Sequence, residues 1–295
     1  MTPAALAWKQ IAWNGISISI PQSWEVEKIG NHYLALEENT RPVMELKWHR
    51  VKGNFSHRKH LRRLAGLYNK NLTQKINASP LPSEWEQALD RFDAKGFSWR
   101  DDNVQGIGAI IYCPICQTAT LIQFYRHKQA QTAKVSQHIL TSFRDHRKDQ
   151  MIIWAVFDIR AAIPAEYTLE AYRLEAGRFS LAFTAKHQKL KLYRWGPAAV
   201  LLSEKDLLHF LRDQRLIPEA ARLINDGKNQ IEGIVSSSSG RWPAVINLLK
   251  PRPSFQAFRF WHLEDKNRIL GVYTAGKKAI SNEGFNALCS GYESL

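Results

Sequence analysis

The chain has 295 residues, of which 44% are hydrophobic and 23% charged, a composition typical of folded globular domains and not of disordered chains. Its formal net charge of +14 favours association with acidic surfaces or polyanions. No apolar run reaches the ~18 residues that a membrane span needs, no secretory signal pattern opens the chain, and 3 cysteines are too few for a disulfide framework. We therefore expect a cytoplasmic protein without membrane insertion, long enough for two domains.

Alternating hydrophobic residues mark the first strand. Ile16, Ile18 and Ile20 alternate with serines, which is the period of a half-buried strand. Pro21 ends this strand because proline cannot donate to a ladder. Similar patterns predict strands over residues 24–28, 33–36 and 43–51, so we expect a four-stranded antiparallel meander.

A helix and three strands follow the meander. Ser56 fits an N-cap, and Leu61, Leu64 and Leu72 recur at helical spacing, which predicts a helix over residues 57–75. The proline-containing stretch 77–82 ends it. Strands are then expected at 97–100, 107–112 and 118–125, and a closing helix at 131–145.

The second half repeats this order of elements. Ser203 resembles an N-cap with an acid three residues later, before a leucine-rich helix. Asp226-Gly227 resembles a C-cap, which predicts an added helix over 218–225. The serine-rich stretch 236–240 and the proline-rich stretch 251–253 are expected to be loops. Strands are predicted at 153–163, 167–174, 178–185, 189–195, 256–262 and 268–274, and a final helix at 281–292.

The two halves also share short sequence segments. ISISIPQSW at 16–24 reappears as IRAAIPAEY at 159–167, and MELKW at 44–48 matches KLYRW at 191–195. The separation between matching segments grows only slowly along the chain, as small loop insertions in one of two copies would produce. We therefore predict two tandem α+β domains, 1–147 and 148–295, each an antiparallel β-sheet with a mid-chain helix and a C-terminal helix.

This element order, together with the turn Ile20-Pro21-Gln-Ser-Trp24, resembles the Mog1/PsbP-like fold. The resemblance covers both halves and implies two Mog1/PsbP-like repeats. Members of that fold are mostly non-enzymatic, among them nuclear-transport regulators and extrinsic subunits of photosystems. No functional residue of these families matches this sequence closely enough to be transferred.

A basic cluster lies around the start of the first predicted helix. Its cations fall on two successive helical turns, opposite the leucines, and on the segment before the helix. Free amides at a helix N-terminus suit anions. We expect these residues to bind an acidic protein partner. The alternative function is sequence-independent binding of nucleic acid. The structural explanation without a function is a solvated helix face. The residues of this predicted face are Arg50, Lys52, Arg58, Lys59, Arg62 and Arg63.

The sequence contains one Cys-x-x-Cys motif, Cys113-Pro-Ile-Cys116. This spacing suits one zinc ion or a redox disulfide, and His127 is a third candidate ligand, but no fourth is evident. Residues 104–125 read as a β-hairpin with the motif at its tip. We favour two incidental thiols in a turn, and expect no cofactor and no stably bound metal, with metal binding and thiol redox chemistry as alternatives.

Motifs for common catalytic chemistry are absent from the sequence. It contains no nucleophile elbow, zinc-protease helix, phosphate-binding loop or dinucleotide loop. The aromatic run at 255–261 alternates like a core strand, although aromatic side chains can also stack bases. We therefore predict a non-enzymatic binding protein, whose partner and oligomeric state the sequence leaves open.

Overall fold

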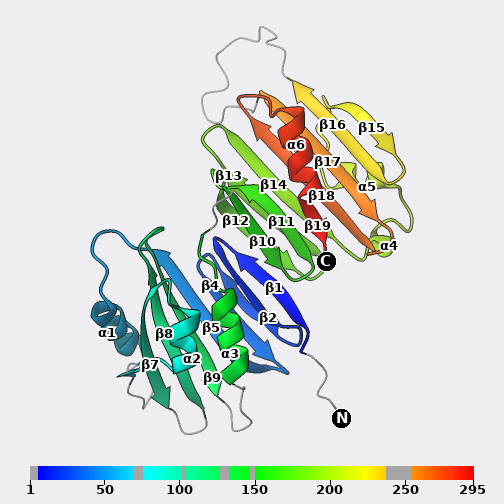
Figure 1. The fold of residues 1–295 in the computed structure, drawn as a ribbon. Coiled ribbons are helices and arrows are strands. Elements are labelled where there is room, and N and C mark those ends of the chain that lie inside the picture. The colour runs from blue at the N-terminus through cyan, green and yellow to red at the C-terminus, as the bar shows by residue number, and fades with distance from the viewer. Residues whose placement is uncertain (1–5, 69–75, 101–103, 127–132, 147–149, 237–253) are drawn as a thin grey trace. The chain divides into compact units, whose positions relative to one another are not determined.

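The chain forms two compact units. The first comprises Met1–Asp149 with Ile153–Phe157, and the second comprises Gln150–Ile152 with Asp158–Leu295. Both units combine antiparallel sheet with a few helices, which is an α+β architecture (Figure 1). The computed structural model describes residues 6–68, 76–100, 104–126, 133–146, 150–236 and 254–295. Across these ranges, the helices are too short or too polar to cross a bilayer.

A seven-stranded antiparallel sheet forms the framework of the first unit. Side chains alternate between its faces, so Leu46 and Trp48 lie on one face while Glu45 and Lys47 lie on the other. From one edge to the other, the strands are β3 (Glu25–Gly30), β4 (Tyr33–Glu38), β5 (Arg41–Arg50), β9 (Thr118–Arg126), β8 (Gln105–Cys113), β7 (Asp93–Arg100) and β6 (Asn77–Ser79).

Helices cover both faces of this sheet. On one face, Leu64 packs against Phe97 in a buried cluster. On the other, the Trp85 ring lies 5.3 Å from the Phe124 ring, and its Nε1 donates to Ser136 Oγ at 3.0 Å. Figure 1 shows the helices that carry Trp85 and Ser136 side by side over the sheet. The three helices are α1 (His57–Tyr68), α2 (Ser83–Ala88) and α3 (Ala133–Ser142).

A hairpin precedes the large sheet. Its strands, β1 (Trp8–Trp13) and β2 (Ile16–Pro21), are joined by Asn14-Gly15, whose φ angles of 45° and 91° suit the tight turn of a two-residue hairpin. Strand β10 (Met151–Val156) pairs with β1 at Ala12 and Ala155. The hairpin is tied to α3, because the Ser19 amide donates to Ser142 Oγ at 2.8 Å.

The second unit also contains a seven-stranded antiparallel sheet. Strands β11 (Ile159–Pro164) and β19 (Tyr292–Ser294) lie outside this sheet and pair with each other. In both large sheets, three consecutive strands start from one edge and four later strands fill the other half in reverse chain order. The strands of the second sheet are β12 (Thr168–Glu175), β13 (Arg178–Thr184), β14 (Gln188–Trp195), β18 (Arg268–Gly276), β17 (Phe255–Leu263), β16 (Gln230–Ser236) and β15 (Arg222–Gly227).

Helices again cover both faces of the sheet. Phe210 packs on the face that carries Trp195 and Phe260. On the opposite face, Arg259 Nη2 donates to Asn286 Oδ1 at 2.7 Å. The helices of this unit are α4 (Ala198–Leu201), α5 (Leu207–Asp213), which carries Phe210, and α6 (Asn282–Ser290), which carries Asn286.

Several predicted core residues are confirmed. Trp24, Trp48, Tyr167 and Trp195 are only 2–5% exposed. The Cys-x-x-Cys motif lies at the tip of a hairpin, as expected, because Cys113 at the end of β8 pairs with the first residue of β9.

The predicted helix over 218–225 is wrong. Residues 222–227 form β15, so Asp226 and Gly227 are its last two residues. Gly227 pairs with Gln230, and Lys228-Asn229 form the hairpin turn into β16. The Asp-Gly signal therefore marks the end of a strand instead of the end of a helix. Ladder hydrogen bonds with β16 override the helical pattern of this short segment.

Other differences concern the ends of elements. Asp206, not Ser203, caps α5, because its side chain accepts from the His209 amide. The predicted strand at 153–163 is two strands, interrupted where Phe157 adopts a φ of 55°. The sequence patterns did not predict β1, β6, β19, α2 or α4. The end of the first predicted helix, residues 69–75, the start of the 131–145 helix and the loops at 237–240 and 251–253 lie outside the described residues.

Candidate functional site

Packing fixes the orientation of α1. Ser56 Oγ accepts the Lys59 amide at 3.4 Å, as expected of an N-cap, and the carbonyl of Ser56 accepts the His60 amide at 3.2 Å. Leu64 is buried in a cluster with Phe97 and Trp99 of the sheet. Because the leucine face is held against the sheet, the basic side chains on the opposite side of the helix point to solvent.

The structure confirms that the predicted cations are exposed. None of them forms an ion pair with a residue in the described part of the chain. We call this set the basic face. Its members are Arg50 at the end of β5, Lys52 just after it, and Arg58, Lys59, Arg62 and Arg63 on α1.

Histidines lie beside the basic face. The His49 and His60 rings stack with centroids 5.3 Å apart. Burial lowers the pKa of His49, and the charges of His60 and Arg63 lower it further. The lowered pKa means that His49 favours its neutral form.

The helix in the corresponding position of the second unit is charged differently. Lys205 pairs with Asp213 at 2.7 Å, and His209 lies 2.8 Å from Asp206. The segment around α5 therefore mixes acids with cations, and one of its lysines is paired. A basic face of this kind belongs to the first unit.

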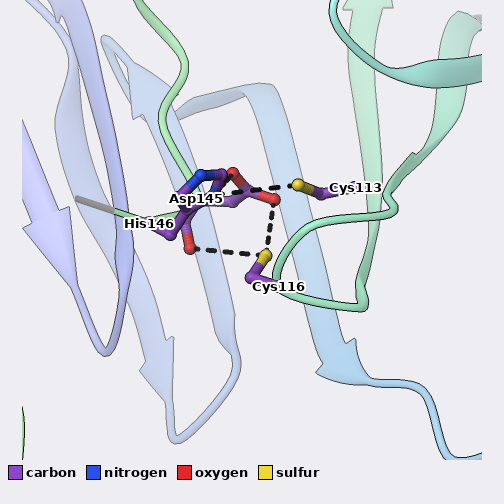
Figure 2. Close-up of side chains that lie close together, drawn as sticks. All are labelled: Cys113, Cys116, Asp145 and His146. Carbon is purple, nitrogen blue, oxygen red and sulfur yellow. Dashed lines mark hydrogen bonds and ion pairs between the residues drawn. The ribbon is translucent and has the colours of Figure 1, made fainter. Parts of the chain in front are cut away.

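The Cys-x-x-Cys motif lies beside a segment that is distant in sequence. The chain leaves α3 through Phe143, which is fully buried, and Arg144 exchanges two backbone hydrogen bonds of 2.8 Å with Ser17 of β2. These contacts hold the next two residues, Asp145 and His146, at the tip of the β8–β9 hairpin (Figure 2).

The four polar side chains at this tip contact one another. The Cys116 thiol donates to Asp145 Oδ2 at 3.1 Å, and Cys113 Sγ lies 3.7 Å from His146 Nδ1. The same His146 nitrogen lies 2.8 Å from Asp145 Oδ1. Burial raises the pKa of the Cys116 thiol to about 12, and the Asp145 carboxylate contributes to the increase. We call Cys113, Cys116, Asp145 and His146 the thiol cluster.

Sequence reasoning found half of the thiol cluster. The two cysteines were singled out by their spacing, whereas Asp145 and His146 are some 30 residues further along the chain and carry no motif of their own. His127, the predicted third ligand, lies outside the described residues. The pairing of Arg144 with Ser17, which brings the two halves of the cluster together, has no sequence signature.

A second polar group in the first unit is buried in the sheet. Glu45 is 5% exposed, and its Oε2 accepts hydrogen bonds from Gln123 and, at 2.9 Å, from the Tyr125 hydroxyl. Lys47 Nζ lies 2.7 Å from its other oxygen. Burial alone would raise the pKa of Glu45, but Lys47, Tyr125 and Gln123 together lower it. Both oxygens of the Glu45 carboxylate therefore have partners within the sheet, which indicates a structural role.

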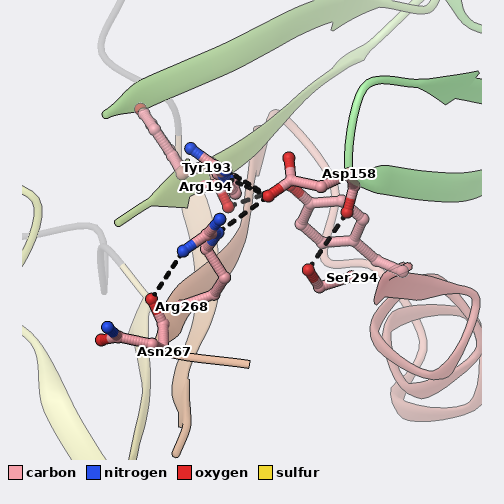
Figure 3. Close-up of polar contacts among 7 residues, drawn as sticks. Asp158, Tyr193, Arg194, Asn267, Arg268 and Ser294 are labelled. Atoms are coloured by element: carbon pink, nitrogen blue, oxygen red, sulfur yellow. Dashed lines mark hydrogen bonds and ion pairs between the residues drawn. The ribbon is translucent and has the colours of Figure 1, made fainter. Parts of the chain in front are cut away.

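The second unit pairs a buried arginine, Arg194, with a partly buried acid, Asp158 (Figure 3). Asp158 Oδ2 accepts hydrogen bonds from Arg194 and, at 2.8 Å, from Arg268 Nε, while its backbone carbonyl accepts from Ser294 Oγ at 3.1 Å. Burial alone would raise the pKa of Asp158, but the two guanidinium groups lower it. This cluster connects the turn before β11 with β14, β18 and β19, so it joins elements that are distant in sequence.

Comparisons with known proteins do not assign a family. No family model matches the chain, and no curated protein is similar to it. A solved structure from Bacteroides thetaiotaomicron VPI-5482 has 13% identity and a TM-score of 0.31, and the match spans about half of that protein, 52% of each chain. The immunity protein TplEi of T6SS from Pseudomonas aeruginosa has 9% identity and a TM-score of 0.30 over 97% of each chain. Similarity this low defines no shared function, and neither description names the Mog1/PsbP-like fold.

Proposed function

We propose that the chain is a non-enzymatic binding or adaptor protein of the cytoplasm, whose basic face engages an acidic surface of a partner protein. One observation carries the proposal. Arg58, Lys59, Arg62 and Arg63 are exposed on successive turns of α1 and have no ion-pair partner among the described residues. A partner that supplies carboxylates would neutralise a surface that the fold leaves unbalanced.

The stability of α1 does not account for these charges. Arg58 and Arg62, and likewise Lys59 and Arg63, are four residues apart, and like charges at this spacing destabilise a helix by roughly 0.2–0.5 kcal/mol per pair. Cations in the first turn also oppose the helix dipole, and α1 has no acidic residue there. Local stability therefore does not explain why these four side chains are basic, whereas a role in binding does.

The fold-level part of the proposal is that the two units are tandem Mog1/PsbP-like repeats, residues 1–147 and 148–295. The shared strand order of the two large sheets and the helices on both faces of each support this interpretation. So does the repeated Ile-Pro turn, with Trp24 and Tyr167 buried in equivalent places after it. The resemblance to this fold favours binding over catalysis.

Nucleic acid is the alternative partner for the same face. Free amides at the start of α1, surrounded by cations, would suit phosphate oxygens as well as carboxylates. Base stacking receives less support, because Phe258 and Phe260 of the aromatic run are fully buried in the second sheet. We therefore favour an acidic protein and treat sequence-independent nucleic-acid binding as an outcome of the test.

A fourfold charge reversal tests the proposal. The variant changes Arg58, Lys59, Arg62 and Arg63 to Glu, and the matched control reverses four lysines of the second unit that are exposed and lack ion pairs with described residues. Proteins retained from cell extract by the wild type are then purified, and their affinities for all three forms are measured at several salt concentrations. The control lysines are Lys186, Lys228, Lys266 and Lys277.

We expect an acidic protein to bind the wild type and the control with similar, salt-sensitive affinity and to lose affinity for the α1 variant. Equal binding by the wild type and the α1 variant would show that the basic face does not bind the partner. Tight binding of random-sequence DNA or RNA to the wild type at physiological salt, lost in the α1 variant, would establish the alternative.

A further inference from the structure

We propose that the thiol cluster is a zinc site, in which Cys113, Cys116, Asp145 and His146 bind one Zn²⁺ ion. The four side chains offer two sulfur atoms, one nitrogen and one carboxylate oxygen, and these ligand atoms all lie within 4.8 Å of one another. The site is independent of the basic face. It replaces the sequence-based expectation of two incidental thiols.

The geometry is close to that of a tetrahedral site. Bonds of roughly 2.0–2.3 Å from a central zinc ion place its ligand atoms about 3.5 Å apart. The Cys116–Asp145 and Cys113–His146 contacts of 3.1 and 3.7 Å are already in this range. Small side-chain rotations are therefore sufficient to surround an ion.

The chemistry of the donors selects the metal. Two thiolates and an imidazole favour zinc over Mg²⁺ or Ca²⁺, which prefer oxygen ligands. The thiols must lose their protons when the ion binds, and the charge of the ion drives this loss. With two thiolates and one carboxylate, the protein supplies enough negative charge to balance a divalent cation.

Burial and ligand number indicate a structural site. Cys113 is 2% exposed, and the Asp145 side chain is 4% exposed. Four protein ligands leave no open position for substrate, which is the pattern of structural and not of catalytic zinc. Cys116 is partly exposed, and the His146 side chain is 35% exposed, so the cluster borders solvent on this side.

The position of the cluster explains what an ion would stabilise. Cys113 and Cys116 belong to the tip of the β8–β9 hairpin, whereas Asp145 and His146 follow α3 and are anchored to β2 through Arg144. A bound ion would cross-link these two segments. In the second unit, the corresponding turn between β17 and β18 is Glu264–Asn267, which has no cysteine, so the cross-link would be specific to the first unit.

The test uses the full chain and the metal alone. Protein purified under reducing conditions from zinc-supplemented cultures is dialysed and analysed for metal, and apoprotein prepared with a chelator is titrated with Zn²⁺ and with Co²⁺. We expect about one zinc per chain. Cobalt should give the thiolate charge-transfer band and the visible absorption of a tetrahedral site. Zinc should also raise the melting temperature of the apoprotein.

Variants identify the ligands. Cys113→Ser and His146→Gln should each weaken zinc binding by more than the roughly 10–100-fold that is typical of losing a residue that only hydrogen-bonds to a metal ligand. The matched control is Cys289→Ser, which removes the buried cysteine of α6 in the second unit and should leave binding unchanged. Cobalt spectra of the wild type need no variant, so a misfolded variant does not compromise the test.

Three outcomes would overturn the proposal. The first is wild-type protein that retains no zinc and shows no thiolate-to-cobalt band while its thiols are reduced. The second is zinc binding that Cys113→Ser leaves unchanged. The third is a Cys113–Cys116 disulfide that forms in the metal-free protein and persists in the presence of zinc and reductant, which would indicate a redox pair.

Discussion

Helices α1 and α5 occupy similar places on the two large sheets but present different surfaces. Each packs an apolar side chain, Leu64 or Phe210, against aromatic residues of its sheet. The cations of α1 are unpaired among the described residues, whereas Lys205 beside α5 is paired with Asp213. Packing thus requires the same apolar face in both units and leaves the outer face free to differ. We infer that the outer face of α1 serves binding.

The acids that accept several hydrogen bonds, buried Glu45 and partly buried Asp158, also differ between the two units. Glu45 of the first unit is balanced by one partly exposed lysine and by neutral donors, whereas Asp158 of the second is balanced by two arginines. Both carboxylates have lowered pKa values. The two units therefore neutralise these carboxylates with different donors, although their large sheets have the same strand order.

The largest expected effect compares buried tryptophans on different faces of the two large sheets: Trp48 lies on the face opposite α1, whereas Trp195 packs against Phe210 of α5. Trp48→Ala and Trp195→Ala should each destabilise the protein by about 3–5 kcal/mol, because each removes a large buried ring. Chemical unfolding followed by circular dichroism measures the loss. If one of the two substitutions leaves the stability unchanged, the ring at that position does not contribute to the core.

Phenylalanine substitutions sharpen the same comparison. Trp48 Nε1 donates to the Asn14 carbonyl at 3.2 Å, whereas Trp195 Nε1 is buried without a hydrogen-bond partner in the described structure. Trp48→Phe should therefore cost about 1 kcal/mol more than Trp195→Phe. Equal losses would contradict this difference.

Asp158→Asn is expected to destabilise the second unit by about 3 kcal/mol at neutral pH, because it leaves the buried Arg194 charge uncompensated. The folded-state pKa of Asp158 is below its unfolded value of about 3.9. Its contribution is therefore fully present above that value and is lost as the pH falls towards the folded pKa. The difference in unfolding free energy between wild type and variant should shrink in acid. A constant difference from neutral pH to pH ~2 would exclude this ionic role.

Glu45→Gln should have a smaller effect, about 1–2 kcal/mol, because Gln123 and Tyr125 are neutral donors that can also satisfy an amide oxygen. The sign of its pH dependence is the same, since the pKa of Glu45 is lowered in the folded protein. Unfolding measurements at neutral and acidic pH check this. A loss as large as that of Asp158→Asn would show that Lys47 contributes more than its exposure suggests.

The smallest effect on stability is expected from the fourfold reversal of Arg58, Lys59, Arg62 and Arg63 to Glu. Each exposed substitution should change the unfolding free energy by no more than about 0.5 kcal/mol, and acids in the first turn suit the helix dipole. The melting temperature should stay near that of the wild type. A large decrease would mean that these cations stabilise the fold, and would weaken the argument that they serve binding.

Local sequence patterns were sufficient to predict many of the strands and the basic helix. The alternation through Ile16, Ile18 and Ile20 identified β2, and the matched segments identified β5 and β14. The leucines around residue 61 identified α1 and the outward direction of its cations. Such features follow from side-chain periodicity, which depends only on neighbours in the sequence. The Asn14-Gly15 turn is typical of a two-residue hairpin, but β1 before it does not alternate between buried and exposed residues, so periodicity does not predict this strand.

The sequence by itself determined which residues are apolar and at what period, and therefore which strands and helices have a buried side. It also determined that the first unit carries a basic helix. Only the tertiary structure decided whether Asp226-Gly227 ends a helix or a strand, because ladder bonds with β16 outweigh local preference. Only the tertiary structure, too, brought Asp145 and His146 to Cys113 and Cys116. That contact depends on the pairing of Arg144 with Ser17, between segments more than 100 residues apart, and no local pattern encodes such a pairing.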